Sequence, residues 1–356
     1  MIDFNKIFSE RLKRARIMKG FSMDELCEKM EKQISKQTIS KYERGLCLPG
    51  SSNLILLCDA LEVSPDYFFK KSDVSIGNIE FRKKSRLGAK NEDSIRESIR
   101  DNMEKYMEIE ELCGANQGFV NPLGSFKVTS ESDVYDAVDE LKDVWRIGQD
   151  GILSVTDLLE SKNIKIVELN VNLDFDGLSG IVNNNPQLPF IVLNNCIVER
   201  MRFTAMHELG HLVLQFEDTV PQKDREKLCH LFANEMLISK EVFIDKVGVK
   251  RKEIYLQELK ELQFIYGISI DALMIKAKYL GVITESSYKG FCIKKNRSKY
   301  FKMAVEESRY NVMERSTRFD MLVYRALADD LISTSKAAVL LDVSIDKVIN
   351  SMESMY

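Results

Sequence analysis

Histidine is scarce in this chain, and its positions constrain the fold more than any other feature. The 356 residues contain three histidines, and all of them fall between His207 and His230. Two belong to the run His207-Glu208-Leu209-Gly210-His211. On an α-helix, residues four apart are neighbours on one face, so His207 and His211 can offer two imidazole nitrogens to one ion. The run therefore predicts a helix with a metal-binding face.

The residue types in this run are those that zinc-dependent hydrolysis of a substrate needs. Zn²⁺ lowers the pKa of a bound water toward about 7, and a neighbouring carboxylate can take the proton and pass it to a leaving amine. Glu208 is the candidate for that general base and acid. Thr204 is placed to cap the helix, and apolar residues recur at helical spacing from Phe203 to Phe216. A buried helix whose histidines only bond backbone carbonyls is the alternative.

A third protein ligand has to come from a second helix, expected over Arg225 to Leu237. Glu226 and His230 lie four residues apart there and share a face. Catalytic zinc sites use three protein ligands and leave one position open, and a carboxylate or an imidazole can complete such a set. On spacing alone the two residues are nearly equivalent. Cys229 lies beside both and is the one cysteine worth testing for metal contact.

The region around the histidine run resembles the ImmA/IrrE family of bacterial metallopeptidases. The matching residues are Arg202-Phe203-Thr204, the run itself, Phe232-Ala233 and Met236-Leu237. The family carries Glu-x-x-Ala-Asn-x-Phe-Ala on its second helix, with the glutamate as third zinc ligand. In that match Glu226 takes the ligand position, Cys229 the alanine and His230 the asparagine. The resemblance implies a zincin-like peptidase domain that holds Zn²⁺ by His207, His211 and Glu226. His230 is the runner-up as third ligand.

A small β-sheet is expected just before the histidine run. Strands are predicted over Ile164 to Leu169, Leu178 to Asn183 and Pro189 to Asn194, the last two joined by the turn Asn184 to Gln187. In zinc peptidases of the kind resembled, a strand beside the zinc helix pairs with an extended substrate. Ile191 to Leu193 are the candidates for that edge. An ordinary hairpin that closes a small sheet is the alternative.

Residues 1–70 repeat short helical segments separated by turns. Five helices are expected, over Phe8 to Met18, Met23 to Met30, Lys36 to Arg44, Ser51 to Leu61 and Pro65 to Phe69. The pattern is similar to the XRE or phage-repressor type of helix-turn-helix domain. The matching residues are Leu12, Arg16, Glu25-Leu26, the run from Ser35 to Gly45, Pro49 and the run from Leu61 to Phe68. The resemblance implies a five-helix, repressor-like DNA-binding domain.

In that domain type the third helix enters the major groove by its N-terminal end. The residues expected to reach base edges are Lys36, Gln37 and Lys41, and those expected to reach phosphates are Ser35, Ser40 and Arg44. The turn from Glu31 to Ile34 is longer than the family's tight, glycine-containing turn. Residues 1–70 hold 12 Lys and Arg against 10 Asp and Glu, while the whole chain has net charge -4, so nucleic-acid binding is expected to be local. A repressor-like fold used only for protein binding or dimerisation is the alternative.

Charge and turn residues organise the rest of the sequence. Residues 71–125 read as a linker with a solvated, charged connecting helix from Asn91 to Leu112, and Gly114 to Ser125 as a boundary loop. The peptidase domain is expected over residues 126–290 and a helical C-terminal region over residues 291–356. The chain as a whole is therefore expected to be α+β and mostly helical.

The sequence also bears on compartment. It has no apolar run long enough to span a membrane, and Met1 to Lys13 lacks the apolar core of a signal peptide. A cytoplasmic protein without membrane contact is expected. Its seven cysteines form no Cys-x-x-Cys pair and are expected to be reduced core residues.

These observations predict a transcriptional regulator in which a DNA-binding domain is fused to a Zn²⁺-dependent endopeptidase. By resemblance, such peptidases cut repressors of the helix-turn-helix type, so the expected substrate is a partner protein or the chain's own linker. Repressor-type domains commonly dimerise, and a homodimer on a double-stranded DNA operator is expected. The alternative is an antitoxin that represses its operon and grips a toxin with a peptidase-like fold. In a further alternative, zinc or a small ligand switches the DNA affinity.

Overall fold

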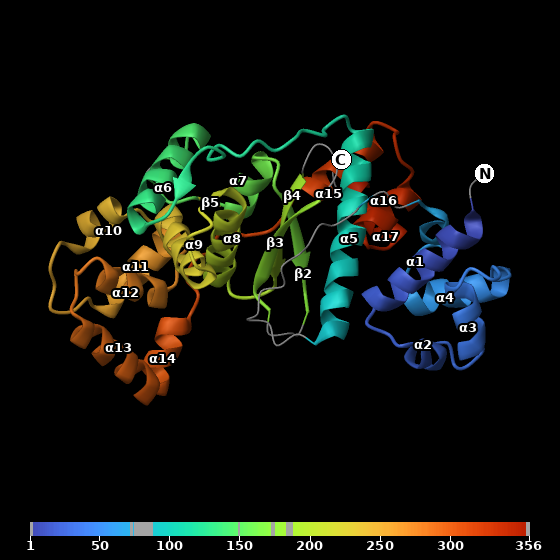
Figure 1. Ribbon diagram of the computed structural model, residues 1–356, viewed down its shortest axis with the longest axis horizontal. Helices are drawn as coiled ribbons and strands as arrows, with labels where there is room; N and C mark the ends of the chain where they lie inside the picture. Colours follow the sequence, from blue (N-terminus) through green and yellow to red (C-terminus); the bar gives the residue numbers. More distant parts are fainter. Residues whose placement is uncertain are drawn as a thin grey trace. The chain divides into compact units, whose positions relative to one another are not determined.

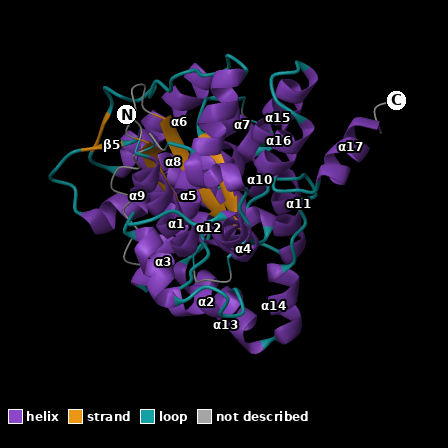
Figure 2. Cartoon of the chain, turned by 90° about the vertical axis from the view of Figure 1, so that its right-hand side faces the viewer, coloured by secondary structure: helices purple, strands orange, loops and turns teal. Residues whose placement is uncertain are grey.

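The fold is mostly helical with a few short strands (Figure 2), which confirms the predicted α+β class. The computed structural model describes residues 3–71, 74, 88–148, 150–171, 175–182 and 188–353. The chain divides into two compact units. The first unit holds Met1–Gln117, Val182–Asn184 and Arg318–Tyr356, and the second unit holds Gly118–Ile181 and Asn185–Thr317.

The first unit begins with five short helices close to the expected positions. They are α1 (Phe4–Met18), α2 (Met23–Lys29), α3 (Lys36–Glu43), α4 (Ser51–Leu61) and the 3₁₀ helix η1 (Pro65–Phe69). Ser22 and Ser35 cap α2 and α3, because each hydroxyl accepts a hydrogen bond from the backbone N–H three residues on. Phe8 and Phe68 pack in the common core with ring centroids 5.1 Å apart. Local capping thus sets where α2 and α3 begin, and a shared apolar core holds the five helices together.

The turn between α2 and α3 is built without glycine. Glu31 and Lys32 have φ of 53° and 59°, a left-handed region that residues with a Cβ rarely occupy. Ile34 then returns to the core with 3% exposure. Two left-handed residues thereby accommodate the longer loop that the sequence indicates.

Helix α5 (Ala89–Leu112) is packed against other helices, so the expectation of a solvated connecting helix is wrong. Its buried apolar residues recur every three or four positions and are Ile95, Ile99, Met103, Tyr106 and Ile109. Arg11 of α1 donates to Glu104 of α5 at 2.5 Å, and Ser94 donates to the Met18 carbonyl at 2.7 Å. The charged residues on α5 therefore do not prevent one apolar face from being covered.

The C-terminal helices also belong to the first unit, so the expected region 291–356 is divided between the units. They are α15 (Arg318–Ala328), α16 (Thr334–Leu341) and α17 (Ile345–Glu353). Phe319 packs on Tyr106 with ring centroids 5.4 Å apart, and Arg318 pairs with buried Glu110 at 2.9 Å. Helix α5 contacts both α1 and α15 within the unit (Figure 1).

The second unit contains a three-stranded sheet beside the histidine-bearing helix, apart from Val182 at the end of one strand, which belongs to the first unit. Its strands, in order across the sheet, are β2 (Lys165–Leu169), β4 (Leu188–Asn194) and β3 (Gly177–Val182), with β2 and β4 parallel. Every residue of β4 is buried, as expected for a central strand. Ile191 to Leu193 are paired on both sides and cannot offer a free edge, so that prediction is wrong. The predicted turn from Asn184 to Gln187 lies outside the described residues.

Helices and one further strand pair complete the second unit. The helices are α6 (Glu131–Trp145), α7 (Val155–Ser161), α8 (Val198–Val213), α9 (Gln222–Leu237), α10 (Lys240–Val247), α11 (Leu256–Tyr266), α12 (Ile270–Tyr279), α13 (Glu285–Arg297) and α14 (Lys299–Glu306). The parallel strand pair is β1 (Lys127–Val128) and β5 (Gln215–Phe216). Helix α8 packs on β4 and on α9 (Figure 1). In the described part of the chain, no helix is both long enough and apolar enough to cross a membrane.

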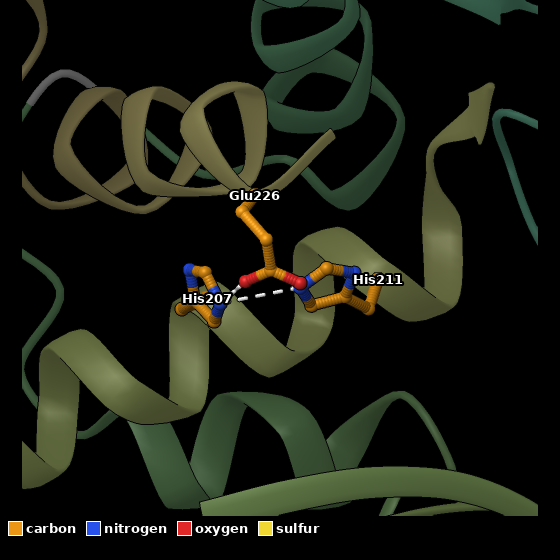
Figure 3. Close-up of side chains that lie close together, drawn as sticks. All are labelled: His207, His211 and Glu226. Carbon is orange, nitrogen blue, oxygen red and sulfur yellow. Dashed lines mark hydrogen bonds and ion pairs between the residues drawn. The ribbon is translucent and has the colours of Figure 1, made fainter. Parts of the chain in front are cut away.

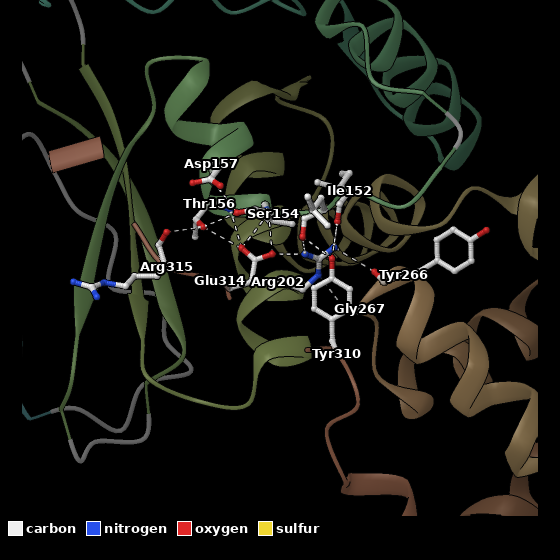
Figure 4. Close-up of polar contacts among 12 residues, drawn as sticks. Ile152, Ser154, Thr156, Asp157, Arg202, Tyr266, Gly267, Tyr310, Glu314 and Arg315 are labelled. Atoms are coloured by element: carbon white, nitrogen blue, oxygen red, sulfur yellow. Dashed lines mark hydrogen bonds and ion pairs between the residues drawn. The ribbon is translucent and has the colours of Figure 1, made fainter. Parts of the chain in front are cut away.

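A segment after α14, here called the strap (Arg309–Glu314), is bound to α8 in the second unit. Glu199 of α8 accepts hydrogen bonds from the backbone N–H groups of Arg309 and Tyr310 at 2.9 and 3.3 Å. Arg202 of α8 pairs with Glu314, both side chains being 0% exposed, and its guanidinium lies 4.2 Å from the Tyr310 ring centroid (Figure 4). Glu314 also accepts from the first two backbone N–H groups of α7. The strap therefore holds the first turns of the histidine-bearing helix.

Candidate metal centre and nucleic-acid interface

Helices α8 and α9 bring three of the expected ligands together. His207 and His211 lie on one face of α8, with their Nε2 atoms 3.1 Å apart. Glu226 reaches them from α9 (Figure 3), its two oxygens lying 3.4 Å from His207 Nε2 and 3.7 Å from His211 Nε2. Thr204, expected to cap α8, lies inside it, because α8 begins at Val198. The strap contacts described above are made by Glu199 and Arg202, which lie on these extra turns.

The three ligand atoms are spaced as the ligands of one metal ion are. All lie within 4.8 Å of one another. Ligand atoms at about 2.1 Å from a tetrahedral zinc are about 3.4 Å apart; here the two Nε2 atoms lie 3.1 Å apart, and each lies 3.4 or 3.7 Å from the nearer oxygen of Glu226. Two imidazoles and a carboxylate are also a donor set that catalytic zinc sites use. The side chains of His207 and Glu226 are 10% and 18% exposed, so the group is shielded but reachable from solvent.

Glu208, the candidate general base, lies beside this group and is held by the neighbouring strand. The Ser179 hydroxyl on β3 donates a 2.7 Å hydrogen bond to Glu208 Oε2. Glu208 itself is 4% exposed. The sequence analysis missed Ser179, although a hydroxyl residue in the strand predicted just upstream of the histidine run was a usable signal. β3 is an outer strand of its sheet, so the residue that holds Glu208 also lies at a sheet edge.

His230, the runner-up ligand, is not in the three-residue group. It is exposed, and its ring centroid lies 4.3 Å from that of His207 and 5.9 Å from that of Phe203. Its ring therefore lies against a ligand ring, while Glu226 faces both Nε2 atoms. The choice of third ligand remains a prediction, and the geometry favours Glu226.

A glycine lets α8 and α9 approach at the level of the ligands. A Cβ on Gly210 would lie 3.1 Å from Cδ1 of Phe232, a tight contact, and 3.5 Å from the Cα and Cβ of Cys229, which is ordinary packing. Cys229 is 0% exposed, and its Sγ lies 3.3 Å from His211 Nδ1. The close approach therefore sets both the ligand from α9 and the environment of the second histidine ring.

The residues expected to contact DNA lie on or beside α3. Ser35, Lys36, Gln37, Lys41 and Arg44 are exposed, and Ser40 is half-buried. Lys36 Nζ pairs with Asp24 at 2.6 Å, but both side chains are more than half exposed, so a phosphate can compete for the ammonium. Arg16 of α1 makes a two-point ion pair with Glu43 at the end of α3, at 2.6 and 2.9 Å. This pair fixes the orientation of α3 on α1.

Two family models match parts of the chain. Residues 12–68 match a helix-turn-helix model, and residues 159–278 match the IrrE N-terminal-like domain. The chain joins a helix-turn-helix domain to an IrrE-like domain. Both resemblances drawn from the sequence are thereby confirmed. No curated protein matches the chain.

The matches define what the two domains are. The helix-turn-helix domain is a DNA-binding domain of the repressor type. The IrrE-like domain is of a metallopeptidase type, and its matched residues include the three clustered ligands on α8 and α9. Glu314 and the rest of the strap lie beyond the matched residues. The expected domain boundaries at residues 70, 125 and 290 remain predictions.

Proposed function

We propose that the chain is a transcriptional regulator with zinc-dependent endopeptidase activity. The observation that carries this proposal is the spacing of the three donor atoms of His207, His211 and Glu226, which suits one tetrahedral ion. These residues would hold Zn²⁺, and Glu208 would act as the general base and acid. The fusion supplies the regulatory part, since the same chain carries a DNA-binding domain.

The chain's own residues account for the proton transfers of peptide hydrolysis. Bound zinc would supply Lewis-acid chemistry that polarises the scissile carbonyl and makes water more acidic. Glu208 takes the proton of the attacking water and delivers it to the nitrogen of the leaving amine as the C–N bond breaks. Ser179 holds Glu208 during these transfers by donating a hydrogen bond to its Oε2.

The substrate is an extended protein segment that pairs with β3. This strand is an outer strand, and its Ser179 contacts Glu208, so a peptide added beside it would pass the catalytic carboxylate. Candidates are a helix-turn-helix repressor and the parts of the chain's own expected linker, residues 71–125, that lie outside the packed helix α5. A fused DNA-binding domain keeps such targets at high local concentration.

Cleavage by a matched pair of proteins tests this proposal. The full chain and Glu208→Gln, which leaves the three ligands in place, are loaded with Zn²⁺ and incubated with candidate repressors. Fragments produced by the wild type and absent with Glu208→Gln support the proposal. Identical fragment patterns, or wild type and His207→Ala with equal zinc content by elemental analysis, reject it.

The proposed DNA contacts are made by α3 to a double-stranded operator. Lys36, Gln37 and Lys41 would read base edges, and Ser35, Ser40 and Arg44 would hold phosphates. A homodimer would read two half-sites one helical turn apart. Selection from random duplexes yields the operator, and sedimentation with and without it gives the oligomeric state.

An antitoxin that binds a toxin without cutting it is the second candidate. It is favoured by His230, which stands where the resembled family has asparagine and lies exposed against His207. Tight binding of a toxin encoded beside this gene, with stoichiometric zinc and no cleavage of any partner, would favour this candidate over the peptidase.

A further inference from the structure

The two ring nitrogens of His211 face different residues of α9. Nε2 lies 3.7 Å from the carboxylate of Glu226, and Nδ1 lies 3.3 Å from the Sγ of Cys229. Glu226 and Cys229 are three positions apart, so both side chains leave the same face of α9. One face of this helix therefore contacts both nitrogens of one histidine.

We propose that Cys229 is a positioning residue that accepts the Nδ1–H of His211 and thereby directs Nε2 toward the metal. The proposal rests on the proposed zinc site. A neutral histidine that binds a metal through Nε2 carries its proton on Nδ1, and a partner for that N–H fixes both the tautomer and the orientation of the ring. Carboxylates, carbonyls and waters usually take this place. Here a sulfur atom, a weak acceptor, takes it.

The packing around Cys229 makes this contact a fixed one. Cys229 is 0% exposed, and its backbone is held against Gly210 at the point where α8 and α9 approach. Gly210 directly precedes His211, so the backbone contact and the sulfur contact are adjacent. The alanine at this position in the resembled family has no side-chain acceptor, so the pairing belongs to this chain.

Cys229 is placed to act through the ring and not as a ligand. A zinc-bound sulfur lies about 2.3 Å from the ion. As a ligand, Sγ of Cys229 would therefore have to lie near Nε2 of His211, where the ion would bind. Sγ instead faces Nδ1, whereas the donor group found among the described residues consists of His207, His211 and Glu226. The sulfur is thus separated from the ion by the imidazole.

Zinc affinity of the full chain tests this inference. Cys229→Ala removes the acceptor, Cys229→Ser keeps one, and Cys58→Ala removes a buried thiol from the first unit as the matched control. In competition with a chromophoric chelator, we expect Cys229→Ala to bind zinc about 10- to 100-fold more weakly. Cys229→Ser should recover most of this loss, and Cys58→Ala should match the wild type. Thermal melting of the metal-free proteins reports whether each variant folds.

Three results would overturn the inference. Equal zinc affinity of Cys229→Ala and wild type would show that the contact has no effect on the site. Equal losses of zinc affinity in Cys229→Ala and Cys229→Ser would show that the effect comes from packing and not from the hydrogen-bond acceptor. With Co²⁺ in place of zinc, a sulfur-to-metal charge-transfer band that Cys229→Ala abolishes would make Cys229 a ligand. Failure of the wild type to bind zinc would instead reject the proposed function itself.

Discussion

A Cβ added to Gly210 would lie 3.1 Å from Cδ1 of Phe232 across the interface between α8 and α9. Phe232 is 0% exposed, so its ring has little room to move away. A side chain at Gly210 would therefore require a shift of a few tenths of an ångström between α8 and α9, the helices that carry the two histidines and Glu226.

Gly210→Ala should accordingly weaken zinc binding. Overpacking a buried contact costs about 1–3 kcal/mol, and the gain in helix propensity returns about 1 kcal/mol. We expect the free energy of unfolding to fall by about 1 kcal/mol, and zinc affinity to fall with it because α9 is displaced. Urea unfolding and chelator competition measure the two effects.

Gly290→Ala is the matched control for this substitution. Gly290 lies inside α13, and nothing would lie within 4 Å of its added Cβ. Its replacement should raise helix stability slightly and leave zinc affinity unchanged. Tighter zinc binding by Gly210→Ala would contradict the packing argument.

Features encoded by neighbouring residues could be predicted from the sequence. The helices of the first domain each carry their own cap or periodicity, and the two histidines share a face because they lie four residues apart on a helix. The second ligand helix was recognised by resemblance, since spacing alone left Glu226 and His230 nearly equivalent. Each of these features is encoded by residues close together in the sequence or by a recognisable family motif.

Features that depend on distant partners could not be predicted. The composition of α5 predicts a solvated helix, yet its apolar face is covered by α1 and α15. The covering helix α15 is distant in sequence: Cys113, which follows α5, contacts Leu322 of α15 across a separation of 209 residues. The first turns of α8 contact the strap through the pair of Arg202 and Glu314, which are 112 residues apart. The order of the strands likewise depends on pairing that periodicity does not encode.

Ser179→Ala should slow peptide hydrolysis without loss of zinc. A hydrogen bond to a charged group is worth about 1.5–3 kcal/mol, so loss of the contact with Glu208 is expected to lower kcat by about 10- to 100-fold. Zinc content should stay the same, because Ser179 is not among the clustered ligands. Steady-state kinetics with a repressor that the wild type cleaves measure kcat, and elemental analysis measures the zinc content.

Ser179→Thr is the conservative comparison, since it keeps a hydroxyl and suits a strand. We expect it to retain more activity than Ser179→Ala. If both variants turned over as fast as the wild type, Glu208 would not depend on β3 for its orientation.

Glu314→Gln should strongly destabilise the second unit. Arg202 and Glu314 are both 0% exposed, and removing one partner of a buried ion pair costs about 3–5 kcal/mol because the other charge is left uncompensated. The chain's single tryptophan, Trp145, lies in the second unit, so its fluorescence during urea unfolding reports on this unit. Glu307→Gln, whose side chain is 57% exposed beside Lys260, should cost less than about 1 kcal/mol. Similar costs for the two variants would contradict the role given to the strap.

Glu108 should make the first unit sensitive to acid. Burial alone would raise the pKa of Glu108, but hydrogen bonds and charge from Lys70 and Lys336 outweigh it and lower the pKa below the ordinary value of 4.5. The unfolded chain then takes up the proton at higher pH than the folded chain, so stability is lost as the pH falls below about 4.5. Glu108→Gln should flatten this loss. Urea unfolding of metal-free protein, followed by circular dichroism from pH 7 down to about pH 2, measures it.

Glu28→Gln provides the comparison for Glu108, since Glu28 is an exposed glutamate on α2. It should leave the acid dependence of stability as in the wild type. The same flattening in both variants would mean that the acid sensitivity does not come from the ion pairs at Glu108.

Gln37 and Arg44 should affect operator binding in different ways. Both side chains are exposed. Gln37 lies at the N-terminal end of α3, which meets base edges in repressor domains, whereas Arg44 caps the C-terminal end, where contacts are expected with the DNA phosphates. Gln37→Ala should weaken operator binding by about 1–3 kcal/mol and relax sequence preference at one position. Arg44→Gln should weaken binding to all duplexes alike and reduce the slope of log K against log salt by about 0.9. Fluorescence anisotropy on selected and scrambled duplexes over a salt series separates the two effects. An equal loss on both duplexes for Gln37→Ala would show that Gln37 does not read a base.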